Sequence, residues 1–127
     1  MQRMRVLLAD DHAGVLGVVR GLLESDFDVV GTVDNGESLF DAATKLKPDI
    51  IVTDISMPKL SGIDAVNRLR ESGCSSNVVF LTVHNDPDIV RIALKGGALG
   101  YVLKNSMDMD LLLAIQEAIE GRVFVSA

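Results

Sequence analysis

Five short apolar runs alternate with longer segments of helical period, and this alternation constrains the fold more than any other feature of the chain. Such a pattern is typical of repeated βα units, in which the strands lie parallel in one sheet. Most of the runs are apolar throughout, as expected for strands that are covered on both faces. The expected strands are Val6–Ala9, Val29–Val33, Ile50–Thr53, Val78–Leu81 and Tyr101–Leu103.

The segments between these runs carry apolar residues at three- and four-residue spacing, which predicts helices with one buried face each. The predicted buried positions are Val15, Leu16, Val18, Val19, Leu22 and Leu23; Leu39, Ala42, Ala43 and Leu46; Ile63, Val66 and Leu69; Ile89, Ile92 and Ala93; and Leu111, Leu112, Ile115 and Ile119. A chain of 127 residues has room for one such domain. We therefore expect a single α/β domain with helices on both faces of a parallel sheet.

Charge and composition exclude several classes of function. Eighteen acidic residues against twelve basic ones give a net charge of −6, which argues against direct binding to nucleic acid or anionic lipid. No apolar run has the length of a membrane span, and residues 1–5 lack the features of a signal peptide. The single cysteine, Cys74, has no partner for an internal disulfide. These features predict a cytoplasmic protein.

Chemically distinctive side chains directly follow four of the five expected strands. Asp10 and Asp11 follow the first strand, Asp54 the third, Thr82 the fourth and Lys104 the fifth. In open parallel sheets, ligands bind outside the carboxyl ends of the strands. We therefore expect three acids, a hydroxyl and an amine to share one edge of the sheet.

Acids on neighbouring strands would repel one another, so this edge needs a cation. Magnesium is suited to the task, because it binds a few carboxylate and carbonyl oxygens together with water and phosphate oxygens. Lys104 would then pair with a phosphoryl oxygen, and Asp54 would act as the nucleophile that accepts the phosphoryl group. The simpler alternative for any one residue is capping of the next helix, and Thr82 is placed to cap the one near Pro87.

The residues at the strand ends resemble those of CheY-like receiver domains of bacterial response regulators, and the similarity runs from Arg5 to about Gly121. The matching segments are Leu8–His12, Asp49–Asp54 with Met57-Pro58 and Gly62, Thr82, and Gly97–Lys104. The resemblance implies a doubly wound, flavodoxin-like (βα)5 sandwich whose five-stranded sheet has the order 2-1-3-4-5. It assigns residues 1–127 to one receiver domain.

The resemblance also implies roles for single residues. Asp54 would be phosphorylated by a sensor histidine kinase and would later lose the phosphoryl group in a reaction that the domain itself catalyses. Asp11, Asp54 and the backbone carbonyl of Ser56 would bind Mg²⁺ directly, or Mn²⁺ in its place, and Asp10 would act through water. Lys104 would pair with the phosphate.

Thr82 and Tyr101 would form the switch that the resemblance implies. The Thr82 hydroxyl would move toward the phosphoryl oxygens, and Tyr101 would turn inward as the space that Thr82 leaves is filled. The surface altered in this way is the fourth helix, fifth strand and fifth helix, residues 87–120, which often forms the dimer or partner face in this family.

Several positions depart from the commonest family pattern. Asn105 follows Lys104 where many relatives have a proline after a cis bond, so the isomer of this peptide bond is left open. Val83 is bulkier than the usual alanine or glycine, and we expect it to narrow access to Asp54 and to slow phosphorylation and hydrolysis. Ser56 and His84 occupy positions that tune how readily water attacks the acyl phosphate in relatives.

Several other residues suggest a function but have a simpler structural explanation. His12 and His84 are read as exposed loop histidines, because neither has a second histidine at metal-ligand spacing, and a zinc site is not expected. Gly14, Gly17 and Gly21 do not fit a phosphate-binding loop, and we expect them to permit close helix packing.

The last residues, 121–126, resemble the exit from receivers that continue into a LuxR-type helix-turn-helix domain. We therefore expect a switch that controls DNA binding through a domain absent from this sequence, and a stand-alone receiver is the alternative. Two other functions are open. A phosphatase acting on separate substrates is disfavoured because Ser56 stands where such enzymes carry a second acid. A receiver-like module that signals without phosphorylation is disfavoured by the complete set of site residues.

Overall fold

The structure is a computed structural model that describes residues 3–126. All six strands lie parallel in one sheet with the order β2-β1-β3-β4-β5-β6. The strands are β1 (Arg5–Ala9), β2 (Asp28–Val33), β3 (Ile50–Thr53), β4 (Asn77–Thr82), β5 (Gly100–Leu103) and β6 (Phe124–Val125). The helices are α1 (Ala13–Leu23), α2 (Gly36–Leu46), α3 (Gly62–Glu71), α4 (Pro87–Lys95), the 3-10 turn η1 (Lys104–Ser106) and α5 (Met107–Ile119).

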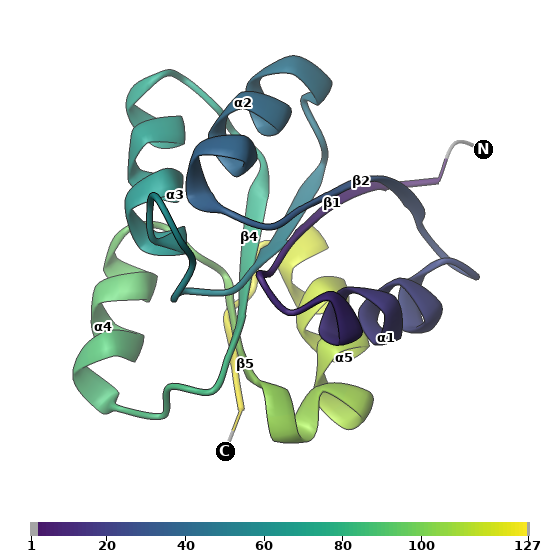
Figure 1. The fold of residues 1–127 in the computed structure, drawn as a ribbon. Coiled ribbons are helices and arrows are strands. Elements are labelled where there is room, and N and C mark those ends of the chain that lie inside the picture. Colours follow the sequence, from purple (N-terminus) through teal and green to yellow (C-terminus); the bar gives the residue numbers. More distant parts are fainter. Residues whose placement is uncertain (1–2, 127) are drawn as a thin grey trace.

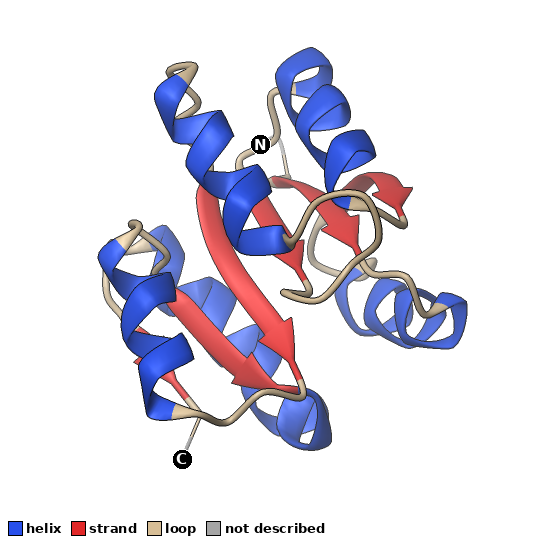
Figure 2. Cartoon of the chain, turned by 60° about the vertical axis from the view of Figure 1, so that its left-hand side comes forward, coloured by secondary structure: helices blue, strands red, loops and turns tan. Residues whose placement is uncertain are grey.

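The helices form two layers around the sheet. Helices α1 and α5 cover one face, and α2, α3 and α4 cover the other (Figure 1). Figure 2 shows the strands enclosed between helices on both sides. Successive residues of a strand point to opposite faces, so Val6 and Leu8 pack with α1 and α5, whereas Leu7 and Ala9 pack with α2 and α3.

The five predicted strands and their order are confirmed, but the prediction of a five-stranded sheet was wrong. A sixth strand, β6, pairs with β5 through hydrogen bonds from Phe124 N to Leu99 O and from Ser126 N to Tyr101 O, each 2.9 Å long. This strand is only two residues long and half exposed, so its sequence carries neither the length nor the apolar run that marks the other five.

Two predicted buried positions and one predicted packing role were also wrong. Val18 is 51 % exposed and Ile92 is 54 % exposed, because each lies at the margin of a wide apolar stripe whose centre faces the sheet. Gly14, Gly17 and Gly21 do not mediate close packing: a Cβ atom added at any of them would meet nothing within 4 Å among the described residues.

Side chains in the loops cap the amino-terminal ends of three helices and so define the residues at which these helices begin. Asn35 accepts a hydrogen bond from Ser38 N at the start of α2, and Ser61 accepts one from Asp64 N at the start of α3. Asp86, not Thr82, caps α4, and Pro87 occupies its first turn. Over residues 3–126, no helix is long and apolar enough to cross a membrane.

Two helical glycines differ sharply in their surroundings. A Cβ atom at Gly36 would lie 2.0 Å from the backbone carbonyl oxygen of Leu60, so α2 approaches the loop after β3 more closely than any side chain permits. Gly17 in α1 faces open space.

We expect Gly36→Ala to lower the free energy of unfolding by about 1–3 kcal/mol, because the backbone must shift to relieve the clash. Gly17→Ala, the matched control, should raise it by about 0.5–1 kcal/mol, because alanine loses less backbone entropy in a helix. Urea unfolding of both variants measures this. A stable Gly36→Ala variant would contradict the close approach of α2 to the loop.

Candidate functional site

The carboxyl ends of β1, β3, β4 and β5 meet at one edge of the sheet, as their parallel pairing requires. Strands β1 and β3 are direct neighbours, and Ala9 is in register with Thr53. The backbone continues this pairing for one more residue, because Asp54 N donates to Ala9 O at 2.9 Å. Asp10 and Asp54 therefore leave adjacent strands at the same level.

Three carboxylates converge at this edge. Ligand atoms of Asp10, Asp11, Asp54 and His12 all lie within 4.8 Å of one another. Asp10 and Asp54 are buried, whereas Asp11 and His12 are exposed at the rim. One oxygen of Asp54 accepts a hydrogen bond from Ile55 N at 2.7 Å, which fixes the orientation of the carboxylate.

Lys104 lies between the two buried acids. Its Nζ atom is 2.8 Å from Asp10 Oδ2 and 3.0 Å from Asp54 Oδ2. Burial alone would lower the pKa of Lys104, but the carboxylates of Asp10 and Asp54 outweigh it and raise the pKa above its ordinary value. The ammonium is therefore charged at neutral pH. The Lys104–Asn105 peptide bond, whose isomer was open, is trans.

One ammonium does not balance three carboxylates. Asp10 Oδ2 is paired with the Lys104 ammonium and has no other polar partner among the described residues. Because Lys104 is shared between Asp10 and Asp54, its single positive charge offsets only part of the negative charge of the three carboxylates. The donor set is rich in oxygen, which is the ligand atom that divalent magnesium and manganese accept. These residues can therefore hold such an ion.

Gly62 determines how closely α3 approaches Asp54, and this role was not evident from the sequence. Gly62 N donates to Ile55 O at 2.7 Å, and a Cβ atom at Gly62 would lie 1.9 Å from the carbonyl oxygen of Asp54. The hydroxyl of Thr53 donates to that same oxygen at 2.9 Å. The absence of a side chain at position 62 thus lets α3 support the backbone of the central acid.

His84 contacts three residues that the sequence analysis assigned to switching or tuning. His84 N donates to Thr82 Oγ1 at 3.2 Å, and the Tyr101 hydroxyl donates to His84 O at 2.7 Å. The ring atom Nε2 lies 2.7 Å from Ser56 Oγ, which joins the loops after β3 and β4. Tyr101 already lies inward, with 1 % of its surface exposed, and Thr82 is fully buried. Val83 is 71 % exposed.

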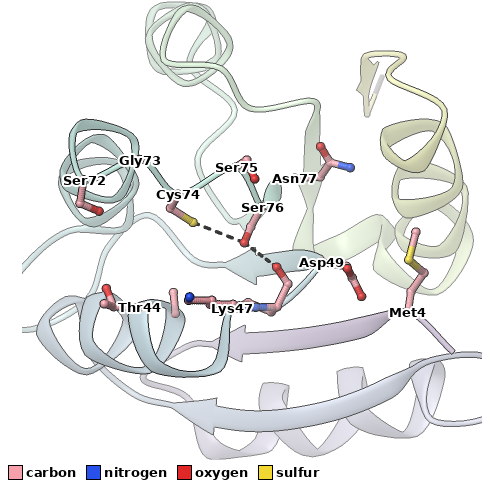
Figure 3. A pocket seen from close by; sticks show the side chains of 12 residues that line it. Met4, Thr44, Lys47, Asp49, Ser72, Gly73, Cys74, Ser75, Ser76 and Asn77 are labelled. Atoms are coloured by element: carbon pink, nitrogen blue, oxygen red, sulfur yellow. Dashed lines mark hydrogen bonds between the residues drawn. The ribbon is translucent and has the colours of Figure 1, made fainter. Parts of the chain in front are cut away.

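Two of the hollows in the surface lie at opposite edges of the sheet. A groove of about 480 Å³ beside the acids is lined by Asp11, Ser56 and neighbouring loop residues. A hollow of about 620 Å³ lies at the opposite edge of the sheet, where the strands begin, and none of the site residues lines it (Figure 3). There the free thiol of Cys74 donates to Ser76 Oγ at 3.4 Å, and Ser76 donates to a backbone carbonyl.

The parallel sheet, the acids at its carboxyl edge and the lysine between them define a receiver-like α/β domain. Comparison with protein families identifies the family of this domain. Residues 6–116 match the response regulator receiver domain, and the chain belongs to this family. Receiver domains are signalling domains rather than enzymes with separate substrates.

Relatives agree with this assignment. The chain is 40 % identical over 124 residues to the transcriptional regulatory protein YvfU of Bacillus subtilis, covering 95 % of this chain and 62 % of that protein. It is 38 % identical to the nitrate/nitrite response regulator protein NarL of Escherichia coli, covering 95 % of this chain and 57 % of NarL. The chain thus spans about three fifths of the length of these relatives.

Solved structures share the fold. The signal receiver domain of the response regulator NarL from Mycobacterium tuberculosis matches with a TM-score of 0.88 at 31 % identity, covering 96 % of this chain and all of that one (100 %). The isolated receiver domain of RcsB from Salmonella enterica serovar Typhimurium, determined with the phosphomimetic BeF3−, matches with a TM-score of 0.89 at 31 % identity, covering 98 % and 94 %.

Burial raises the pKa of Tyr101 to about 12, with further contributions from the charges of Asp86 and Asp54. We expect the folded chain to show this value in an absorbance titration, which reports Tyr101 alone because the chain has one tyrosine and no tryptophan. The resulting stability is fully present below pH 10 and is lost as the pH rises through 12, a change of about 2–3 kcal/mol.

Tyr101→Phe is the control for this titration, because it lacks the ionising group while keeping the ring. Its unfolding free energy should therefore fall less than that of the wild type between pH 10 and pH 12. A tyrosine midpoint near pH 10 in the folded protein would contradict the buried position of the hydroxyl.

Proposed function

We propose that this domain is the phosphorylation-dependent switch of a two-component system, which accepts a phosphoryl group on Asp54 from a sensor histidine kinase. The observation that carries the proposal is the position of Lys104, whose ammonium contacts both Asp10 and Asp54. This arrangement places a fixed positive charge beside the acid that would be phosphorylated.

Mg²⁺, or Mn²⁺ in its place, is the proposed cofactor. Asp11, Asp54 and the backbone carbonyl of Ser56 would hold the ion, with Asp10 acting through water. The close grouping of the acids and the excess of three carboxylates over one ammonium support this assignment. When bound, the ion offsets the remaining negative charge and stabilises the oxygens of a transferring phosphoryl group.

The side chains of this domain would catalyse only its own modification. A carboxylate oxygen of Asp54 attacks the phosphorus atom, and the bond from phosphorus to the donor's nitrogen or oxygen breaks, with its electron pair leaving on the donor atom. Lys104 pairs with a phosphoryl oxygen as the phosphoryl group passes to Asp54, and the Ile55 N–H keeps the carboxylate oriented. Water later attacks the acyl phosphate, which releases phosphate and restores Asp54.

The switch would operate through Thr82. Its hydroxyl now accepts a hydrogen bond from His84 N, and a phosphoryl group on Asp54 would offer it a charged acceptor instead. Tyr101 already lies inward and is held by His84 O, so movement of Thr82 is the larger change in this proposal. Residues 87–120, which include α4, β5 and α5, would carry the change to a partner or to a second copy of the domain.

The output would be transcriptional. YvfU is named as a transcriptional regulatory protein, and this chain covers only 62 % of its length. We propose that residues 1–127 form the receiver of such a regulator, with DNA bound by a separate carboxyl-terminal domain. The net charge of −6 supports a receiver that makes no direct contact with nucleic acid. We place the protein in the cytoplasm, where a sensor kinase could reach it.

Intact-mass spectrometry tests the central proposal. After incubation with acetyl phosphate and Mg²⁺, we expect the wild-type chain to gain one phosphoryl group and Asp54→Ala to gain none. Asp41→Ala, which removes an exposed acid of α2, is the matched control and should be modified like the wild type. Chelation of Mg²⁺ should abolish the gain. Modification of Asp54→Ala to the wild-type extent would overturn the assignment of Asp54.

Val83 gives a second test. We expect Val83→Ala to speed both phosphorylation by acetyl phosphate and loss of the phosphoryl group by about two- to tenfold, since a smaller side chain would open access to Asp54. Val18→Ala removes a comparably exposed valine from α1 and should leave both rates unchanged. Unchanged rates in Val83→Ala would refute a role for this residue in access.

A further inference from the structure

The last described residues lie along the edge of β5 that faces away from β4 (Figure 1). Phe124 N donates to Leu99 O and Ser126 N donates to Tyr101 O, each at 2.9 Å. The half-buried side chain of Phe124 packs against the part of the core that α1 and α5 cover. We call residues 124–126 the latch, because they hold the segment that follows α5 against the sheet.

The hydroxyl of Ser126 ties the latch to the end of β5 and to α5. It accepts a hydrogen bond from Leu103 N at 3.2 Å and donates one to Asp110 Oδ2, in the first turn of α5, at 2.9 Å. This side chain supplies the acceptor that Leu103 N would otherwise take from a longer strand. One hydroxyl therefore joins three elements at the point where β5 ends.

The latch adjoins the proposed switch across the sheet. Thr82 of β4 is in register with Leu103 of β5, and Leu103 bonds on its other side to Ser126. The next residue is Lys104, whose ammonium lies 3.0 Å from Asp54 Oδ2. A shift of the end of β5 therefore changes contacts at the site and at the latch together.

The latch is held more weakly than the central strands of the sheet. Strand β6 is two residues long, and Val123 and Val125 are 56 % and 41 % exposed. The strands β1, β3 and β4, by contrast, are buried over nearly their whole length. Segments with few buried contacts open locally at a small cost in free energy, without unfolding of the domain. The latch can therefore detach while the sheet stays intact.

We propose that the latch is bound in the unmodified domain and detaches when Asp54 carries a phosphoryl group. The inference rests on the proposed function, in which Lys104 pairs with a phosphoryl oxygen. Because Lys104 then leaves Asp10, the end of β5 shifts. This shift takes Leu103 N out of line with Ser126 Oγ. The segment that follows α5 is thus held against β5 before modification and is free to move after it.

Amide hydrogen exchange followed by NMR tests the release of the latch. BeF3−, added together with Mg²⁺, serves as the phosphomimetic, and fluorine NMR reports whether it binds. We expect BeF3− to speed exchange at Phe124 N and Ser126 N by about tenfold or more, without speeding exchange at Val79 N in β4. Asp54→Ala, treated in the same way, should show no change at the latch.

Ser126→Ala tests the same coupling from the other side, because coupling between two sites is reciprocal. Without BeF3−, we expect exchange at Phe124 N to be about three- to tenfold faster, and BeF3− to bind about two- to fivefold more tightly. Ser126→Thr, which keeps the hydroxyl, should restore wild-type exchange and affinity. Ser25→Ala removes an exposed serine hydroxyl after α1 and is the matched control, with both quantities unchanged.

Fluorine NMR separates failure of this inference from failure of the proposed function. If BeF3− binds but exchange of the latch amides is unchanged or slower, the inference is overturned and the proposed function stands. Wild-type affinity for BeF3− in Ser126→Ala would overturn it equally. If the wild-type chain shows no signal for bound BeF3−, the proposed function fails and the inference fails with it.

Discussion

The imbalance between three carboxylates and one ammonium at the carboxyl edge of the sheet is the constraint on which the site depends. Asp10 and Asp54 are buried on adjacent strands, where their charges repel one another in a medium that screens poorly. Lys104 reaches them from β5, although β4 lies between β5 and β3. Only a long, flexible cationic side chain can cross the end of that strand, which explains why a lysine follows β5.

A single residue, His84, connects the loop that follows Asp54 to Thr82 and Tyr101, the proposed switch residues. Its ring contacts Ser56, its N–H contacts Thr82 and its carbonyl contacts Tyr101. Because the last two contacts are made by the backbone, substitution at position 84 alters the link to Ser56 while the other two can persist. The loop after β4 therefore contacts Thr82 and Tyr101 through its main chain and Ser56 through its side chain.

The sequence predicted the strands and the grouping of the site residues well, because both follow from patterns along the chain. Continuous apolar runs mark strands that are buried on both faces, and parallel pairing brings their carboxyl ends together. The sixth strand escaped prediction because Phe124–Val125 forms no such run. The contact of His12 with two acids was missed as well, since the orientation of an exposed ring depends on loop geometry and not on periodicity.

The short strand β6 also affects how sheets of neighbouring molecules can meet. An open strand at the margin of a sheet is a template on which another chain can pair and begin to aggregate. Here β5 does not offer that template, because the backbone of residues 124–126 already occupies its outer side. What is left exposed at this margin is two residues long, which is too little for a stable intermolecular ladder to start.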